Sequence, residues 1–252
     1  MEERFVPGPA AEARPMDTPG GDDRAGTGPA AIDDPRALQI LTTEHWSLLT
    51  ARSLVYNETF ARGGMFLAFL SATLLVLGLI STATGFSDAF LSVAAIVLAL
   101  DLFIGLASLG RISAASNEDI RYLQGMNRLR HAYHEMVPGL ESYFITSHHD
   151  DMESVLAIYG GPEEFSQARG IAHGFTTMPG MIAVICSGVA GGLVAVLVLL
   201  ATHDPFLAGV AGLIGFIGWF VAAVALALRA VDRFVSSVES KFPAPGAGPP
   251  RP

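Results

Sequence analysis

A single acidic residue, Asp101, interrupts the apolar stretch AIVLALDLFIGLA at residues 95–107. It lies ten residues before Arg111 and thirteen after Asp88. At a rise of 1.5 Å per residue, its carboxyl is about 15 to 20 Å from either end of the helix that this stretch predicts. A carboxylate at that depth in a membrane costs about 2.5 to 3.5 kcal/mol on insertion scales and commonly marks a path for protons or cations. Proton or cation passage is therefore the first chemistry that the sequence suggests.

Small residues share one helical face with Asp101. Ala94, Asp101, Gly105 and Ser108 follow one another at spacings of seven, four and three along this face. Such a stripe of small residues packs against other helices rather than lipid. We therefore expect Asp101 to face protein. Because the apolar runs contain no Lys or Arg, an ion pair within them is excluded, and burial without a cation favours the protonated carboxyl.

Hydrogen-bond donors at similar depth are the expected partners of Asp101. The candidates for this intramembrane polar site are Thr73, Trp219 and Ser71. A hydroxyl or an indole N–H can donate to a carboxyl oxygen. Three interpretations stay open: a carboxyl that takes part in transport, a hydrogen bond that only holds helices together, and contact with another membrane protein.

Glycines in the apolar runs predict close helix packing. The candidate packing residues are Gly105 on the stripe of Asp101, Gly188 and Gly192 in a GxxxG motif, and Gly212 and Gly215 in the last run. Glycine at these spacings lets helix backbones approach closely.

A polar group of residues follows in the sequences HAYHE at 131–135 and SHHDD at 147–151. Its histidines are His131, His134, His148 and His149. Imidazole and carboxylate ligands suit zinc and other transition metals, but the order is neither HExxH nor HxxEH. A solvated polar face explains these residues as well, so we expect no metal and no cofactor and keep the histidines as candidates only. The absence of GxSxG, GxxxxGK[ST] and GxGxxG motifs predicts that the protein is not an enzyme.

Four apolar runs must position these residues, and each is long enough to cross a bilayer core of about 30 Å. They cover residues 65–83, 89–109, 180–202 and 206–228. The chain is 51% hydrophobic and only 15% charged, as in polytopic membrane proteins. The sequence predicts an all-α fold with four transmembrane helices arranged as two hairpins, together with cytoplasmic helices.

The basic residues predict the orientation. Of the 15 Lys and Arg residues, six precede residue 64, five lie between 110 and 178, four follow the last run, and the connectors STATGFSDAF and THDPF hold none. The positive-inside rule then places both termini and the middle segment in the cytoplasm. The 14 Arg residues against a single Lys, together with abundant Ala and Gly, suggest a GC-rich bacterial genome, and four spans in a bacterial protein predict the inner membrane. The net charge of −9 argues against a nucleic-acid partner, and the single cysteine, Cys186, excludes an intrachain disulfide.

Six segments follow from these patterns. They are a disordered cytoplasmic tail (1–34), a cytoplasmic helix (35–63), a first transmembrane hairpin (64–110), a cytoplasmic helical module (111–178), a second transmembrane hairpin (179–229) and a cytoplasmic tail (230–252), whose end KFPAPGAGPPRP also reads as disordered. Leu41, Leu48 and Val55 recur every seven residues, and Tyr122, Met126 and Leu129 start a seam spaced by four and three. This coiled-coil-like pattern predicts that the two helices pack together or against another protomer.

The sequences EHWSLLTARSLVYNETFARGGMFLAFLS and LQGMNRLRHAYHEMVPGLESYF, followed by TSHHDD, resemble a group of uncharacterised bacterial integral membrane proteins. The resemblance covers roughly residues 38 to 230 and implies a four-helix membrane protein without an assigned activity. The half made of cytoplasmic helix, hairpin and cytoplasmic helix is also similar in layout to the SLATT membrane effectors of bacterial conflict systems. The second hairpin and the long middle segment depart from that layout, which puts a pore-forming role in doubt.

Two functions are consistent with the sequence. The first is a small oligomeric channel or a proton- or cation-coupled transporter centred on Asp101. The second is a non-catalytic membrane scaffold or sensor whose cytoplasmic helices bind a protein. In either case the expected partners are the lipid bilayer and further copies of the chain.

Overall fold

The computed structural model describes residues 32–159, 174 and 176–246, and these residues form helices and no β-strand. Among them, four helices are long and apolar enough to cross a membrane: α1 (Ala37–Thr84), α2 (Asp88–Met136), α5 (Met178–Thr202) and α6 (Pro205–Ser237). The predicted all-α class and the four apolar helices are thus confirmed. The disorder predicted for residues 1–31 lies outside the described residues.

Helices α1 and α2 are unusually long, with 48 and 49 residues. At 1.5 Å per residue each is about 70 Å long, more than twice the thickness of a bilayer core. No proline interrupts either helix, so nothing removes a backbone donor or forces a kink. The apolar runs at 65–83 and 89–109 therefore continue without a break into the polar sequences beside them. Helix α2 ends just before Pro138 and Gly139, and Gly139 adopts a left-handed conformation with φ 93°.

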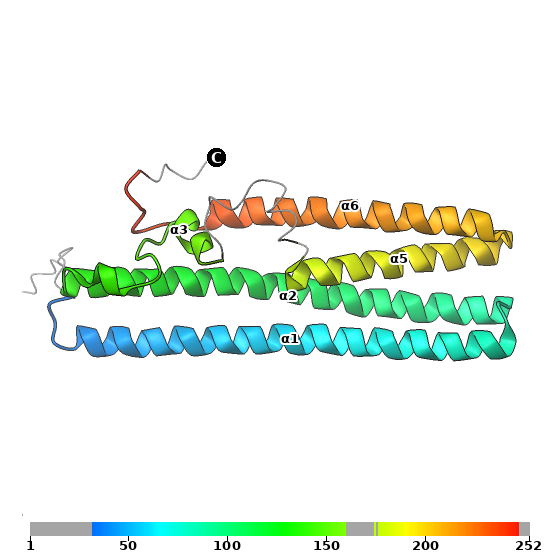
Figure 1. The fold of residues 1–252 in the computed structure, drawn as a ribbon, viewed down its shortest axis with the longest axis horizontal. Coiled ribbons are helices and arrows are strands. Elements are labelled where there is room, and N and C mark those ends of the chain that lie inside the picture. Colours follow the sequence, from blue (N-terminus) through cyan, green and yellow to red (C-terminus); the bar gives the residue numbers. More distant parts are fainter. Residues whose placement is uncertain (1–31, 160–173, 175, 247–252) are drawn as a thin grey trace, which may run out of the picture.

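Short turns connect the helices in pairs. The turn after α1 has Gly85 at φ 63°, and Ser87 then accepts a hydrogen bond from the backbone N–H of Phe90 to cap α2. The turn after α5 places Asp204 as the cap of α6, with Pro205 at its first position. Both turns lie at the same end of the molecule (Figure 1).

The four long helices form a row in the order α1, α2, α5, α6 (Figure 1). Helix α6 lies at one edge of this row, opposite α1, and is the least buried of the four. The largest buried apolar cluster joins α1, α2 and α5, and it consists of Phe66, Leu70, Leu98, Ile112, Ile182, Cys186 and Val189. This cluster holds α5 against the middle of α2.

The other end of the molecule, away from the two turns, is polar, and we call it the polar end. It comprises α1 before residue 64, α2 after residue 110, and residues 137–159 and 238–246. It contains η1 (Leu140–Tyr143), α3 (Met152–Leu156) and η2 (Ala157–Tyr159). Of the residues in the expected seam between α1 and α2, Val55, Met126 and Leu129 are buried here, as is the neighbouring Leu123, which the pattern did not select. The structure differs from the disordered end that the sequence predicts for the C-terminal tail. Residues 238–246 fold back onto α2, because Asp150 binds the backbone of this segment.

Candidate functional site

Asp101 is fully buried, as its small-residue stripe predicts, and Ala94, Gly105 and Ser108 are buried with it. Thr73 of α1, itself 7% exposed, donates its hydroxyl to Oδ1 of Asp101 at 3.3 Å. Oδ2 has no hydrogen-bond partner among the described residues. One predicted partner therefore lies at Asp101, and one carboxyl oxygen is left without a bond.

The other two predicted members of this site lie elsewhere. Ser71 donates its hydroxyl to the backbone carbonyl of Leu67, one turn earlier in α1. Trp219 is half-buried on α6, which packs along α5 and not along this part of α2. Depth along the helix axis, on which the prediction relied, does not determine which helices are neighbours.

The glycines divide in the same way. A Cβ at Gly105 would lie 2.6 Å from Sγ of Cys186, so this glycine lets α5 approach α2. Gly212 and Gly215 contact α5 through Ala195 and Val194. At Gly188 and Gly192, however, a Cβ would meet nothing within 4 Å in the described structure, so the predicted GxxxG motif is not the packing face.

The residue that fills this role is Gly191, which the sequence analysis missed. A Cβ there would lie 2.7 Å from the backbone oxygen of Gly212 and 2.9 Å from Cβ of Phe216. Gly191 and Gly212 therefore lie where α5 and α6 approach each other closely. The signal was present as the first glycine of the pair Gly191-Gly192, one position before the second glycine of the motif.

An ion-pair network surrounds the point where α1 and α2 leave their apolar runs. Arg111 donates to both carboxylate oxygens of Glu58 at 3.0 and 2.8 Å, and to Glu118 at 2.8 Å. Arg62 donates to Glu58 at 2.8 Å. Hydrogen bonds from Arg111 and then Arg62 lower the pKa of Glu58 to about 2. Glu58 thus stays ionised and paired with both arginines at the boundary of the apolar region.

A second polar cluster centres on Asp119, which is 5% exposed. Nε of Arg52 lies 2.6 Å from Oδ1 of Asp119, while the hydroxyl groups of Tyr56 and Tyr159 donate to Oδ2. Burial and the bond to Asp119 both raise the pKa of Tyr159, so its hydroxyl remains a donor. Removing one member of a buried ion pair costs about 3 to 5 kcal/mol. This cluster therefore holds η2 firmly on α1 and α2.

A cavity of about 1130 Å³ opens beside Asp119 and Tyr159. Its walls come from α1, α2, α3, η2, the start of α5 and one residue of α6, and most of the lining is apolar. The lining includes Val55, Phe60, Ala115, Ile120, Leu156 and Met178. Hydroxyls of Thr59 and Ser116 and the carboxylate of Glu153 add polar groups. Its volume slightly exceeds the 300 to 1,000 Å³ typical of small-molecule sites.

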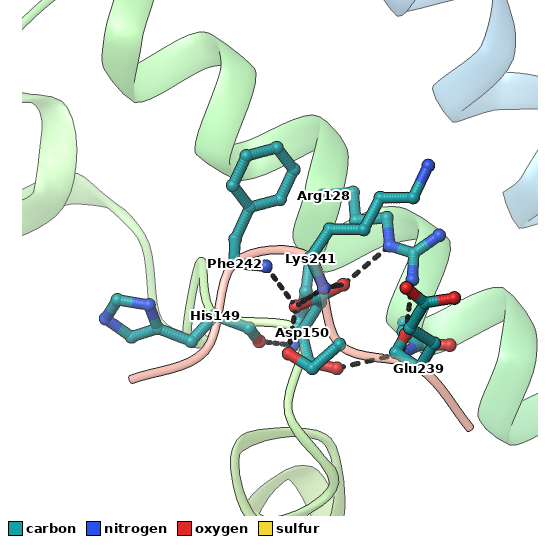
Figure 2. Close-up of polar contacts among 9 residues, drawn as sticks. Arg128, His149, Asp150, Glu239, Lys241 and Phe242 are labelled. Atoms are coloured by element: carbon teal, nitrogen blue, oxygen red, sulfur yellow. Dashed lines mark hydrogen bonds and ion pairs between the residues drawn. The ribbon is translucent and has the colours of Figure 1, made fainter. Parts of the chain in front are cut away.

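Asp150 forms the third polar cluster and binds the segment that follows α6 (Figure 2). Its fully buried carboxylate accepts hydrogen bonds from Nε of Arg128 at 2.6 Å, from the hydroxyl of Ser240 at 2.6 Å, and from the backbone N–H groups of Lys241 and Phe242. The backbone N–H of Asp150 donates in return to the carbonyl of Phe242 at 3.2 Å. We call this arrangement the Asp150 clamp.

The clamp depends on an ionised carboxylate. Burial alone would raise the pKa of Asp150, but the bonds from Lys241, Ser240, Arg128 and Phe242 together lower it to about 2. Gln124 and Arg128 of α2 add bonds to the carbonyl of Glu239. The segment after α6 is therefore fixed on α2 at neutral pH.

The four candidate histidines gather near the clamp, where the ring centroid of His148 lies within 5.7 Å of those of the other three. The side chains of His134 and His148 meet at Glu141, a residue that the sequence analysis did not select. The ring of His131 stacks on Phe242 at 4.0 Å. The ring of His149 lies against His148 at 4.1 Å.

No protein-family model matches this chain, and the comparisons with curated proteins and with solved structures also found no match. The resemblance to bacterial integral membrane proteins therefore stays a prediction. Functional inference rests on the geometry of the polar clusters and the cavity.

Proposed function

We propose that the protein is a multi-pass sensor of a bacterial inner membrane, in which the polar end is cytoplasmic and binds an amphipathic small molecule in the cavity beside Asp119. The orientation is supported by the basic residues, which are absent from both connectors at the end with the turns. The single observation that carries the function is the apolar cavity of about 1130 Å³.

The position of the cavity supports a ligand that reaches it from the membrane surface. Thr59 and Phe60 in its wall directly follow Glu58, whose ion pairs with Arg62 and Arg111 mark the boundary of the apolar runs. A molecule with an apolar body and a small polar head suits such a boundary, since its body can enter the apolar lining while its head remains near hydroxyl groups.

The charges at the cavity favour a neutral or cationic head group. Glu153 lines the cavity beside the Arg52–Asp119 ion pair, which adds no net charge, and an anionic head next to Glu153 would be repelled. The ligand would contact η2, the start of α5, and the extensions of α1 and α2. Its binding can therefore change how the second pair of helices packs on the first.

Exposed apolar side chains supply a surface for passing on such a change. Leu38, Ile40, Trp46 and Leu54 lie on α1 before its apolar run and are each at least 56% exposed. Isolated exposed apolar residues are common, but four on one short helical segment favour contact with another protein or another copy of the chain. The proposed homo-oligomer and protein partner rest on this segment.

The cavity proposal can be tested by photolabelling in membranes with a diacylglycerol that carries a diazirine group. We expect labelling to concentrate on residues 115–120 and 176–181. A Ser116→Trp substitution, which fills the cavity, should reduce this labelling at least about tenfold, the effect of a loss of about 1.4 kcal/mol in binding. Peptide mass spectrometry after irradiation measures the site and the yield.

The matched control is Ser113→Trp, on the same helix but outside the cavity lining, which should leave the labelling unchanged. An anionic diazirine fatty acid should label the cavity less than the neutral probe. Labelling spread evenly over α6, or an equal response of the two Trp variants, would contradict a ligand site.

Transport through Asp101 is the second candidate function, and it is favoured by the buried oxygen Oδ2 that lacks a partner. This function predicts proton or cation flux into proteoliposomes that Asp101→Asn abolishes and that Asp88→Asn, at the exposed start of α2, preserves. Flux no higher than in empty liposomes between about pH 5 and 8 would assign Asp101 to helix packing.

A further inference from the structure

Three side chains of metal-binding type meet where the chain reverses after α2. His134 lies in the last turn of α2. The left-handed Gly139 then turns the chain back, so that Glu141 in η1 lies over that turn. His148 approaches from the segment that leads to Asp150. One ligand atom from each of these three residues lies within 4.8 Å of the others.

The distances suit a small ion after a minor adjustment. Nε2 of His134 lies 2.5 Å from Oε1 of Glu141, and Nε2 of His148 lies 3.9 Å from the same oxygen. With bonds near 2.0 to 2.1 Å, neighbouring ligands of a tetrahedral zinc site are about 3.4 Å apart. The distance from His134 to Glu141 must therefore increase, and the distance from His148 to Glu141 must decrease. Rotation of the Glu141 side chain, which is 58% exposed, can produce both changes.

The surrounding contacts fix the two imidazoles more firmly than the carboxylate. The backbone beside His148 is held by Asn127, which donates to the carbonyl of His149 at 2.7 Å, and by the Asp150 clamp. Both histidine side chains are only about one-fifth exposed.

We infer that His134, Glu141 and His148 form a binding site for Zn²⁺. Two imidazoles and one carboxylate are ligands that zinc accepts, and three protein ligands leave a fourth position for water. A bound ion would join the end of α2, η1 and the segment next to the Asp150 clamp. The site is distinct from the cavity beside Asp119 and does not depend on the sensor function.

Zinc binding to the full-length, tag-free protein tests this site. We expect one Zn²⁺ per chain in titrations against a chromogenic chelator, and a tetrahedral absorption spectrum when Co²⁺ replaces zinc. The variant His134→Gln/His148→Gln should bind Zn²⁺ more than about 100-fold more weakly, since loss of an outer partner alone costs 10- to 100-fold. His203→Gln, an exposed histidine in the turn after α5 that lies 3.7 Å from Asp88, should bind as the wild type does.

Glu141→Gln provides a variant that leaves the fold intact, because this side chain is mostly exposed. It should weaken zinc binding and change the Co²⁺ spectrum while the helical content is unchanged. Equal zinc affinity in the wild type and the double variant, or an octahedral Co²⁺ spectrum in the wild type, would show a polar contact without a metal site.

Discussion

Replacement of Asp150 by Asn should release the segment after α6 and expose it to cleavage at Lys241, the only lysine in the chain. The substitution removes the charge that pairs with Arg128 and turns one acceptor oxygen into an NH₂ group facing backbone donors. Breaking a buried pair of this kind costs about 3 to 5 kcal/mol. Since cleavage follows the population of the open form, a lysine-specific protease should cut about 100-fold faster or more.

The measurement is the mass of the intact chain against time, because cleavage after Lys241 removes a single C-terminal fragment. Asp232→Asn is the matched control, since Asp232 is exposed on α6 and its substitution changes the net charge equally. The control should be cut at the wild-type rate. If Asp150→Asn were cut no faster than Asp232→Asn, the segment would be protected by something other than the clamp.

The contribution of the Asp150 clamp to the stability of the folded state should decrease in acid. A folded-state pKa of about 2 lies below the unfolded value of about 3.9, so ionised Asp150 stabilises the folded state above about pH 4. This contribution falls as the pH drops from about 4 to 2. At neutral pH the clamp is therefore a constant feature of the protein and not a switch.

The sequence was sufficient for features that depend on local patterns. Hydropathy located the four long apolar helices. The stripe of small residues placed Asp101 on a buried face, and depth along the helix identified Thr73 as its donor. Each of these inferences needs only helical periodicity and rise, which the sequence contains.

The features that the sequence did not reveal join residues far apart in the chain. Asp150 and the backbone of Lys241 are 91 positions apart, and Arg52 and Asp119 are 67 apart. Every residue except proline has a backbone N–H, so the residue types at 241 and 242 do not show that their N–H groups bind a carboxylate. Trp219 was misplaced because a periodic pattern shows which face of a helix is apolar but not which helix covers it.

The contact of α5 with α6 gives the second large expected effect. Gly191→Leu should disrupt this contact, because even a Cβ at that position would lie 2.7 Å from the backbone oxygen of Gly212. A backbone atom cannot rotate away, so the helices must separate. With a cost of about 2 to 3 kcal/mol for overpacking, the melting temperature in detergent should fall by about 5 to 10 °C. Differential scanning fluorimetry measures it.

Gly188→Leu is the matched control, on the same helix and within the GxxxG motif that the sequence favoured. A side chain at Gly188 meets open space in the described structure, and replacing glycine within a helix gains up to about 1 kcal/mol in helix propensity. This variant should melt within about 2 °C of the wild type or slightly above it. Equal losses at both positions would mean that α6 packs on the face with Gly188. The reverse order would restore the GxxxG motif as the contact and place α6 on a different side of α5.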